Sequence, residues 1–358
     1  MTDFVVRRAS RVRRLTAMMD REQQLLDATR HGDESAFSQL VAPHRPMLQA
    51  HCYRMLGSVQ DAEDALQEAL LSAWRSLPRF EGRSSLKSWL YKIATNACLR
   101  TIERRPQRLL PIDYGPAADP RQLLAKPLVE SVWVEPYPGV GIDLEAQISS
   151  PAARYEQHES VELAFVAALQ HIPARQRAVL ILRDVLGFSA REVAETLEMT
   201  PAAVDTALQR AHKTVDGRLP ARSQQATLRA LGSDRLREIV DGFVDAWERA
   251  DVNAIVAMLA HDATLTMPPR PTWFRGREAI ATLLRGIPLP AGTRWPLLPV
   301  KANGQLAFGE YRWNYRTNRF GVEGVILLTL EDALIADITM FRAPDLVARF
   351  ELPERLQP

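Results

Sequence analysis

A proline-rich stretch from residue 106 to residue 150 constrains the fold of this 358-residue chain more strongly than any other feature. Because proline lacks a backbone N–H and restricts the residue before it, the stretch excludes long helices. Its length of about 45 residues is also too great for a connection inside one compact domain, so we predict a linker. Apolar side chains, among them Trp133 and Tyr137, interrupt it. We therefore expect residues 133–138 to dock in a groove of a folded domain.

Residues 80–105, just before the linker, carry the most informative local pattern. Gly82 breaks the chain, Ser84 or Ser85 can cap a helix, and apolar residues then recur at helical spacing. The opposite face carries Lys87, Tyr91, Lys92, Thr95, Asn96 and Arg100, and Arg104 and Arg105 follow. Cations neutralise phosphates, rings stack on unpaired bases, and Asn reads base edges. The face fits a nucleic acid, although a solvated basic helix would show the same pattern.

The preceding segment, residues 20–78, is predicted to be helical. Its last helix, at residues 61–77, begins with acidic and amide side chains, Asp61, Glu63, Asp64, Gln67 and Glu68. Acidic groups in the first turns interact favourably with the helix dipole, and this interaction alone is enough to explain their position. They would equally suit a partner helix that presents arginines.

After the linker, residues 154–220 return to helical patterns and contain a compact pair of short helices. Ser189 and Thr200 are predicted N-caps, and Pro201 suits the first turn of the second helix. This is the helix-turn-helix pattern, for which an ordinary α-hairpin is the alternative. The second helix exposes Ala202, Ala203, Asp205, Thr206, Gln209, Arg210 and Lys213. In a DNA reader its N-terminal end would enter the major groove, and Arg210 and Lys213 would meet phosphates.

The last third, from about residue 234, changes from helices to alternating strands, which predicts an α+β domain with an antiparallel meander. Aromatic residues concentrate here and would line the concave side of a curved sheet, as a core or as a pocket. The candidate pocket residues are Met267, Trp273, Phe274, Trp313, Tyr315 and Phe341.

Composition sets further limits. The net charge is only +2, so a nucleic-acid surface must be local, and the arginines near the N-terminus are expected to form a flexible basic tail. No apolar run approaches the ~20 residues of a membrane span, and no secretory signal is evident, which favours a cytoplasmic protein. Cys52 and Cys98 lack metal-ligand spacing and are expected to be buried, reduced thiols. We expect no cofactor and no metal.

Three motifs together resemble a known family. Asp61-Ala-Glu-Asp-Ala-Leu-Gln-Glu and Leu86-Lys-Ser-Trp-Leu-Tyr-Lys-Ile-Ala-Thr-Asn-Ala are similar to region 2 of extracytoplasmic-function sigma factors. Pro173-Ala-Arg-Gln-Arg-Ala-Val-Leu and Glu192-Val-Ala-Glu-Thr-Leu are similar to region 4. The last third, with Met267-Pro-Pro and Trp273-Phe-Arg-Gly, resembles a SnoaL-like (NTF2-type) cone domain. We therefore expect the chain to be most similar to the subgroup of this family that carries such a C-terminal extension.

The resemblance implies two all-α domains followed by an α+β cone domain. The expected parts are a basic tail (1–19), region 2 (20–108), a linker with a Trp/Pro motif (109–153), region 4 (154–222), a second linker (223–233) and the SnoaL-like domain (234–358). In the linker motif, Trp133, Glu135, Pro136 and Pro138 are the expected regulatory residues. The cone domain would modulate activity in place of, or alongside, an anti-sigma factor.

The resemblance also implies partners and site residues. Core RNA polymerase, through its β′ clamp helices and β flap, and promoter DNA would be the partners, without a membrane. The polymerase-binding residues would be Asp61, Asp64, Gln67 and Glu68. The −10 element would meet Phe80, Lys87, Trp89, Lys92, Thr95, Asn96, Arg100 and Arg104, with Asn96 facing a flipped base. The −35 element would meet Thr200, Ala202, Ala203, Asp205, Thr206, Gln209, Arg210 and Lys213.

Other functions stay open at this point. The cone domain could sense a small ligand, or retain cyclase or isomerase activity with His261-Asp262 or Asp241 as acid–base groups. A DNA-binding repressor with a sensor domain would need only the second helical segment. One departure from the family pattern stands out, because Glu198 occupies the helix-turn-helix position where Gly is common. A left-handed Glu would cost about 1 kcal/mol there.

Overall fold

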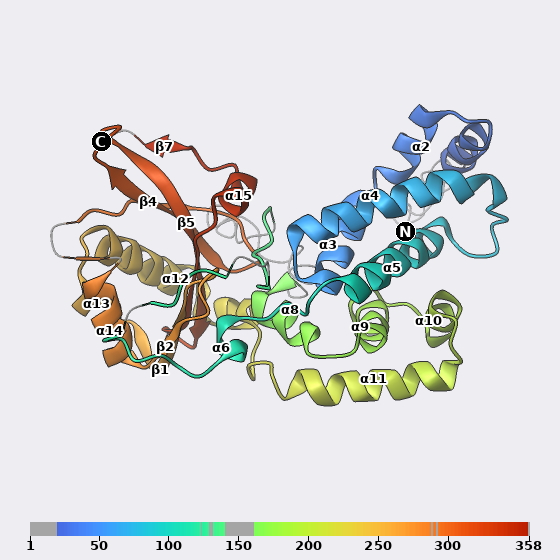
Figure 1. Cartoon of the computed structure of the whole chain (residues 1–358). Helices are drawn as coiled ribbons and strands as arrows, with labels where there is room; N and C mark the ends of the chain where they lie inside the picture. Colours follow the sequence, from blue (N-terminus) through green and yellow to red (C-terminus); the bar gives the residue numbers. More distant parts are fainter. Residues whose placement is uncertain are drawn as a thin grey trace, which may run out of the picture.

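The computed structural model describes residues 20–122, 124–128, 132–139, 161–287, 289–290 and 293–356 (Figure 1). The expected basic tail lies outside the described residues, as do residues 123, 129–131 and 140–153 of the expected linker and residues 154–160 of the expected region 4. A helical part and a part built on a β-sheet lie side by side (Figure 1). No helix within the described ranges is long and apolar enough to cross a membrane.

The first helical group begins with a helical stretch at residues 20–30. It continues with α2 (Glu34–Val41), α3 (Arg45–Leu56), α4 (Val59–Ser76), the 3-10 turn η1 (Leu77–Arg79) and α5 (Leu86–Arg104). The hydroxyls of Ser58 and Ser85 accept hydrogen bonds from first-turn amides of α4 and α5, which fixes where these helices begin. Gly57 ends α3 with φ 68°, a left-handed conformation that glycine adopts without steric cost.

The second helical group forms the predicted helix-turn-helix. It contains α8 (Leu163–Gln170), α9 (Ala174–Leu180), the π-helical turn η3 (Ile181–Val185), α10 (Ala190–Leu197) and α11 (Pro201–Asp216). Ser189 and Glu192 form a reciprocal capping box at α10, and Thr200 caps α11. Because α5 contacts α9 and α10, the two helical groups share one hydrophobic cluster.

The last part is an α+β domain, as predicted. Its helices α12 (Gln224–Glu248), α13 (Val252–Ala257) and α14 (Arg277–Gly286) share a second hydrophobic cluster with the sheet. The strands are β1 (Leu259–Thr266), β2 (Trp273–Arg275), β3 (Leu297–Pro299), β4 (Leu306–Asn314), β5 (Arg319–Glu331), β6 (Leu334–Phe341) and β7 (Arg355–Leu356). Their order is β2-β1-β6-β5-β4-β3, with β7 paired to β5. Only the β1–β6 pairing among these strands of the described chain is parallel.

Both faces of this sheet are covered. Phe308, Ile326 and Met340 pack with the helices of the α+β domain, whereas their neighbours Val325 and Phe341 belong to the cluster of the helical groups. This follows from the alternation of side chains along a strand. The short helices α15 (Pro344–Val347) and η4 (Ala348–Phe350) follow β6 and add Leu346, Val347 and Phe350 to the same cluster. The hydrophobic core therefore continues across the domain boundary.

Residues 223–233 differ from the prediction, because they are helical rather than a linker. They belong to α12, which runs from Gln224 and is interrupted by a kink at Gly232 with φ 73°. The side chain of Gln224 exchanges two hydrogen bonds with the backbone of Leu330, at 2.6 and 2.7 Å. The Glu162 carboxylate accepts from the amides of Gln224 and Gln225, both at 3.0 Å. These contacts stabilise the start of α12 and tie it to the sheet.

The proline-rich segment docks on folded parts, as expected from its apolar residues. It forms one short helix, α6 (Pro111–Tyr114), and then follows the α+β domain, where the Ala118 amide donates to the Trp273 carbonyl at 2.8 Å. The indole N–H of Trp133 donates to the Pro269 carbonyl at 3.0 Å. Trp133 and Tyr137 are buried. The described residues of the segment therefore connect the helical part to the sheet domain.

One buried amide side chain, that of Asn303 in the turn between β3 and β4, joins four segments. Its oxygen accepts from the Tyr137 amide of the proline-rich segment at 2.7 Å. Its nitrogen donates to the Tyr53 hydroxyl on α3 at 3.0 Å and to the Val161 carbonyl before α8 at 2.6 Å. The Tyr53 hydroxyl in turn donates to the Glu135 carbonyl at 2.6 Å. Burial raises the pKa of Tyr53, so its hydroxyl stays neutral and can serve both partners.

We predict that Asn303→Ala lowers the free energy of unfolding by about 3 kcal/mol or more, because several buried polar groups lose their partners at about 1–3 kcal/mol each. Asn318→Ala is the matched control, since Asn318 has the same φ of 51° but is exposed. The control should lose only the ~1 kcal/mol of a left-handed alanine. Urea denaturation followed by tryptophan fluorescence measures both. Equal losses would show that the Asn303 contacts contribute little.

Candidate nucleic-acid interface

The predicted nucleic-acid face lies on α5 and in the turn before it. Phe80 and Trp89 are half-buried, and their ring centroids lie 4.9 Å apart. Asn96 is half-buried two turns further along α5, on the same side as Trp89, and Arg100 follows one turn later and is exposed. Aromatic rings, an amide and a guanidinium therefore share one stripe of the helix. This arrangement fits an unpaired strand with its phosphates.

The structure corrects the prediction that Thr95 meets the −10 element, because Thr95 is fully buried and is not part of this stripe. Its hydroxyl contacts Nε2 of His51 on α3 at 2.9 Å, and the neighbouring Tyr91 is buried as well. Burial lowers the pKa of His51 to about 3, so the ring is neutral near pH 7. The prediction failed because α5 packs against α3 on one side and against α10 on another. Its exposed face is therefore narrower than that of a helix that packs against a core on one side only.

The second helical group covers part of the stripe. Lys92 Nζ donates to the Glu195 carbonyl at 3.2 Å and lies 3.6 Å from the Glu198 carboxylate, both at the end of α10. The ammonium of Lys87 lies 5.5 Å from the centre of the Phe188 ring. Two of the predicted −10 cations are therefore engaged by the helix-turn-helix in this structure.

The acidic end of α4 divides into a buried and an exposed part. The structure corrects the prediction that Asp61 binds polymerase. The Asp61 carboxylate is buried in an ion pair with Arg108 at 2.5 Å and is not available to a partner. Asp64, Gln67 and Glu68 are exposed, and Glu68 pairs with Arg100 on α5 at 2.8 Å. Asp64 and Glu68, two of the predicted polymerase-binding residues, thus line one groove between α4 and α5 with the predicted −10 arginines Arg100 and Arg104.

The role of Arg108 was not predicted from the sequence. Its guanidinium also donates to the Trp133 carbonyl at 3.0 Å and lies 3.4 Å from the Glu135 carboxylate. Glu135 accepts from the Val59 amide at the start of α4 at 2.8 Å. The partners of Arg108 are distant along the chain, so no local signal identified it.

A second missed residue, Arg349 in η4, reaches the same acidic end from the other side. Its guanidinium pairs with the Glu63 carboxylate at 2.6 Å and contacts the side-chain oxygen of Gln60. The C-terminal segment of the α+β domain therefore lies against α4 beside the exposed Asp64.

The predicted −35 residues all lie on α11 or at its cap. All are exposed except Ala203, which is half-buried. The Thr200 hydroxyl accepts from the Ala203 amide at 3.2 Å, and the Thr206 hydroxyl donates to the Ala202 carbonyl at 3.0 Å. Val204, Ala207, Ala211 and Val215 form the buried stripe, so the opposite face is available to a duplex.

The linker residues are held in place. Trp133 packs against Tyr114 with centroids 5.5 Å apart, Pro136 is buried and Pro138 is half-buried. Glu135 binds Ser58 at 3.0 Å as well as Arg108. These four predicted residues form a contact between α4 and the sheet domain.

The six candidate pocket residues do not line one cavity. Met267 and Phe274 are core residues, whereas the indole of Trp273 donates outward to the Gly115 carbonyl at 2.7 Å. Phe341 faces the helical groups, and Tyr315 is 88% exposed. Trp313 packs edge-on against Phe320, with centroids 4.9 Å apart. Because adjacent strand residues face opposite sides, an aromatic cluster in the sequence is divided between faces.

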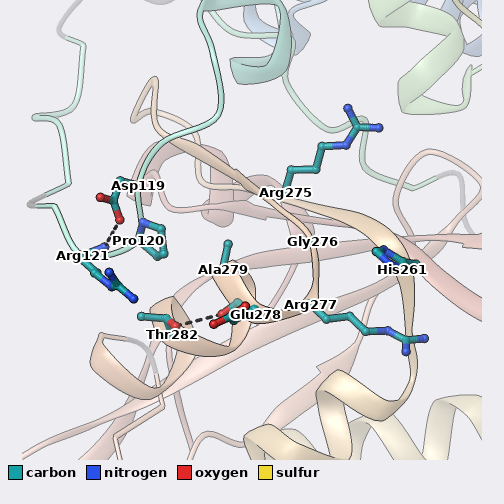
Figure 2. Close-up of a pocket in the computed structure, with 10 residues that line it drawn as sticks. All are labelled: Asp119, Pro120, Arg121, His261, Arg275, Gly276, Arg277, Glu278, Ala279 and Thr282. Carbon is teal, nitrogen blue, oxygen red and sulfur yellow. Dashed lines mark hydrogen bonds between the residues drawn. The ribbon is translucent and has the colours of Figure 1, made fainter.

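The residues proposed for a rival enzymatic role lie on the surface. His261 lines an open cleft of about 630 Å³ between residues 119–121 and the start of α14, as Figure 2 shows. Asp262 pairs with Arg275 at 3.3 Å, and Asp241 is exposed on α12. Within the described residues, no carboxylate forms a hydrogen bond with His261, and no three His, Cys, Asp or Glu residues could hold a metal ion. Cys52 and Cys98 are buried and free.

Comparison with known families agrees with the three parts. Residues 40–107 match the model for Sigma-70 region 2, residues 162–215 the model for Sigma-70, region 4, and residues 240–338 the SnoaL-like domain. The chain is 41% identical over 292 residues to the ECF RNA polymerase sigma factor SigG of Mycobacterium tuberculosis, which covers 79% of this chain and 74% of that relative. It is 26% identical over 197 residues to the RNA polymerase sigma-H factor of Pseudomonas aeruginosa, which covers 55% of this chain and 93% of that relative.

One solved structure is similar over most of the chain. The crystal structure of the Mycobacterium tuberculosis extracytoplasmic function sigma factor SigJ matches with a TM-score of 0.57, at 22% identity, and covers 86% of this chain and 97% of that one. This likeness supports the fold of all three parts.

Glu198 has the predicted left-handed conformation, with φ 55° and ψ 51°. We expect Glu198→Gly to raise the free energy of unfolding by about 0.5–1 kcal/mol, because glycine relieves the strain and loses only part of that gain to chain entropy. Glu198→Gln keeps the strain and removes only an exposed ion pair, which contributes about 0–1 kcal/mol. Thermal unfolding of both variants separates the effects, and a similar decrease in both would show that the pair with Lys92 matters more than strain.

Proposed function

Because this chain belongs to the extracytoplasmic-function sigma factors, we propose that it initiates transcription through the surfaces on α4, α5 and α11. It is an alternative sigma factor with a SnoaL-like domain, and it binds core RNA polymerase and promoter DNA. The residues that carry each contact are our proposal. The observation that supports it best is the stripe of Trp89, Asn96 and Arg100 on α5.

The α5 stripe would capture the melted −10 strand. Unstacking a base costs a few kcal/mol, and stacking on an aromatic ring returns about 1–3 kcal/mol per base. Phe80 and Trp89 supply rings, and the Asn96 amide can bond the edge of a flipped base. Lys87 and Lys92 would neutralise phosphates once they are released from their present neighbours, and the exposed Arg104 would do so as it stands.

The other two contacts follow from exposure and charge. Asp64, Gln67 and Glu68 are exposed on α4 and would bind the β′ clamp helices. The exposed face of α11 would enter the major groove of the −35 element, with Arg210 and Lys213 on phosphates. The second helical group would also meet the β flap.

We infer that this structure is a closed form of the sigma factor. α10 engages Lys92, and η4 engages Glu63, so both region 2 surfaces are partly covered. Exposed ion pairs contribute only about 0.2–1 kcal/mol each, so polymerase can replace them. The apolar contacts of Leu346, Val347 and Phe350 with the helical groups would hold the SnoaL-like domain in place more firmly. The domain would thus act as a built-in restraint.

We predict that Asn96→Ala abolishes run-off transcription from a cognate promoter and leaves binding to core polymerase unchanged, since Asn96 does not line the groove that holds Asp64 and Glu68. Transcription assays and polymerase pull-down measure the two steps separately. Glu103→Gln, also exposed on α5, serves as the control and should retain both activities. A parallel loss of transcription and polymerase binding in the Asn96 variant would sink the assignment.

We predict that Arg349→Glu increases the apparent affinity for core polymerase about fivefold, because it places a like charge beside Glu63 and weakens the closed form by about 1 kcal/mol. Arg355→Glu makes the same charge change at an exposed position on β7 and should bind polymerase like the unaltered chain. Fluorescence anisotropy with labelled sigma factor measures the affinity. Weaker binding by the Arg349 variant would instead make η4 part of the polymerase contact.

A further inference from the structure

The hairpin that joins β4 to β5 has an unusual tip. Residues 312–319 read Arg-Trp-Asn-Tyr-Arg-Thr-Asn-Arg, with three arginines, two aromatic residues and no acidic residue. Tyr315 was expected to line a pocket, but its side chain is 88% exposed. Because the phenol ring is so exposed, it gains no stabilisation from packing in the core. The fold therefore does not explain why an aromatic residue occupies this position.

The cations of the tip are available to a ligand. Arg316 and Arg319 are exposed, and neither guanidinium group has a hydrogen-bond or ion-pair partner in the part of the chain that the structure describes. Arg312 lies 3.9 Å from the Glu323 carboxylate, a weak exposed contact, and 5.7 Å from the centre of the Trp295 ring. The tip is therefore a compact positive surface around an exposed ring.

The tip is also fixed in shape. The side-chain oxygen of Asn314 accepts from the amides of Arg316 and Thr317, at 2.9 and 3.2 Å, and Asn318 adopts a left-handed φ of 51°. Trp313 and Phe320 pack across the two strands beneath the turn. A ligand would thus meet side chains on an ordered turn, which reduces the entropy lost on binding.

The tip lies far from the other DNA-binding surfaces. Phe320 pairs with Leu356, so the hairpin tip lies beside the C-terminus. Figure 1 marks the C-terminus at the end of the molecule opposite to α10 and α11. The tip is therefore not part of the proposed −10 or −35 contacts.

We propose that this hairpin tip is an additional binding site for single-stranded nucleic acid, contributed by the SnoaL-like domain. Arg316 and Arg319 bind successive phosphates, and Tyr315 stacks on an unpaired base. Guanidinium groups and an exposed ring with no acidic neighbour in the turn are the combination that such strands require. An acidic protein surface would form ion pairs with the arginines, but it would not explain the exposed ring of Tyr315. The site uses only this domain, so it does not depend on the role proposed for Asn96.

The test measures the affinity of the full chain for a fluorescein-labelled 20-nucleotide oligo(dT) by anisotropy over a salt series. The double variant R316Q/R319Q should show a salt slope smaller by about 1.4, since each single-strand phosphate contact contributes about 0.7. Tyr315→Ala should bind about 5- to 100-fold more weakly, whereas Tyr315→Phe should retain most of the affinity because it keeps the ring.

Two controls separate this site from other effects. The double variant R235Q/R237Q removes two exposed arginines from α12 of the same domain and should bind like the unaltered chain. The triple variant N96A/R316Q/R319Q should lose the sum of the binding free energies lost by Asn96→Ala and by R316Q/R319Q, because the two surfaces lie apart, so a failure of the proposed −10 role remains distinguishable from a failure here. Thermal unfolding checks that the tip variants keep their fold.

Three results would overturn the proposal. Tip variants could bind oligo(dT) as tightly as the unaltered chain, or Tyr315→Phe could lose as much affinity as Tyr315→Ala. A 20-base-pair duplex could bind as tightly as the single strand, which would exclude stacking on an unpaired base. Vesicles with 30% phosphatidylserine provide a further check, because dependence of vesicle binding alone on the tip arginines would assign the tip to a lipid surface.

Discussion

The hydrogen bonds of Asn303 are the constraint on which the arrangement of this molecule depends. One amide group joins the first helical group, the proline-rich segment, the start of the second helical group and the sheet domain. All of its partners are buried, so each would be left without a hydrogen bond if the parts moved away. The Asp61–Arg108–Glu135 contacts reinforce the same junction a short way along α4. The placement of both proposed DNA-binding surfaces follows from this junction.

Much of the fold was predictable because its signals are local. Ser85, Ser189 and Thr200 cap the helices that they were expected to cap. Residues 223–233 were mistaken for a linker because the contacts of Gln224 with Leu330 and Glu162 are distant in sequence. Local patterns predict an element, whereas distant partners decide whether a short polar segment continues it.

The candidate site shows the same division. Helical spacing placed Asn96 and Arg100 on one face, and the family resemblance added Trp89 to it. It could not tell that Thr95 would be buried against His51 or Asp61 against Arg108, because burial depends on which helices pack on each face. The aromatic residues of the sheet domain failed as a pocket for a related reason. Their register on the strands, rather than their number, determines which face they occupy.

The hydrophobic cluster that runs from the helical groups into the sheet domain has a consequence for evolution. Family models divide the chain into three modules, yet Val325, Phe341 and Phe350 pack in the same cluster as the helices of the other two. A SnoaL-like domain transplanted from a distant homologue would bring an interface shaped for different helices. The modules are therefore expected to have diverged together after their fusion, and chimeras should work only when the linker and both sides of this interface come from one parent.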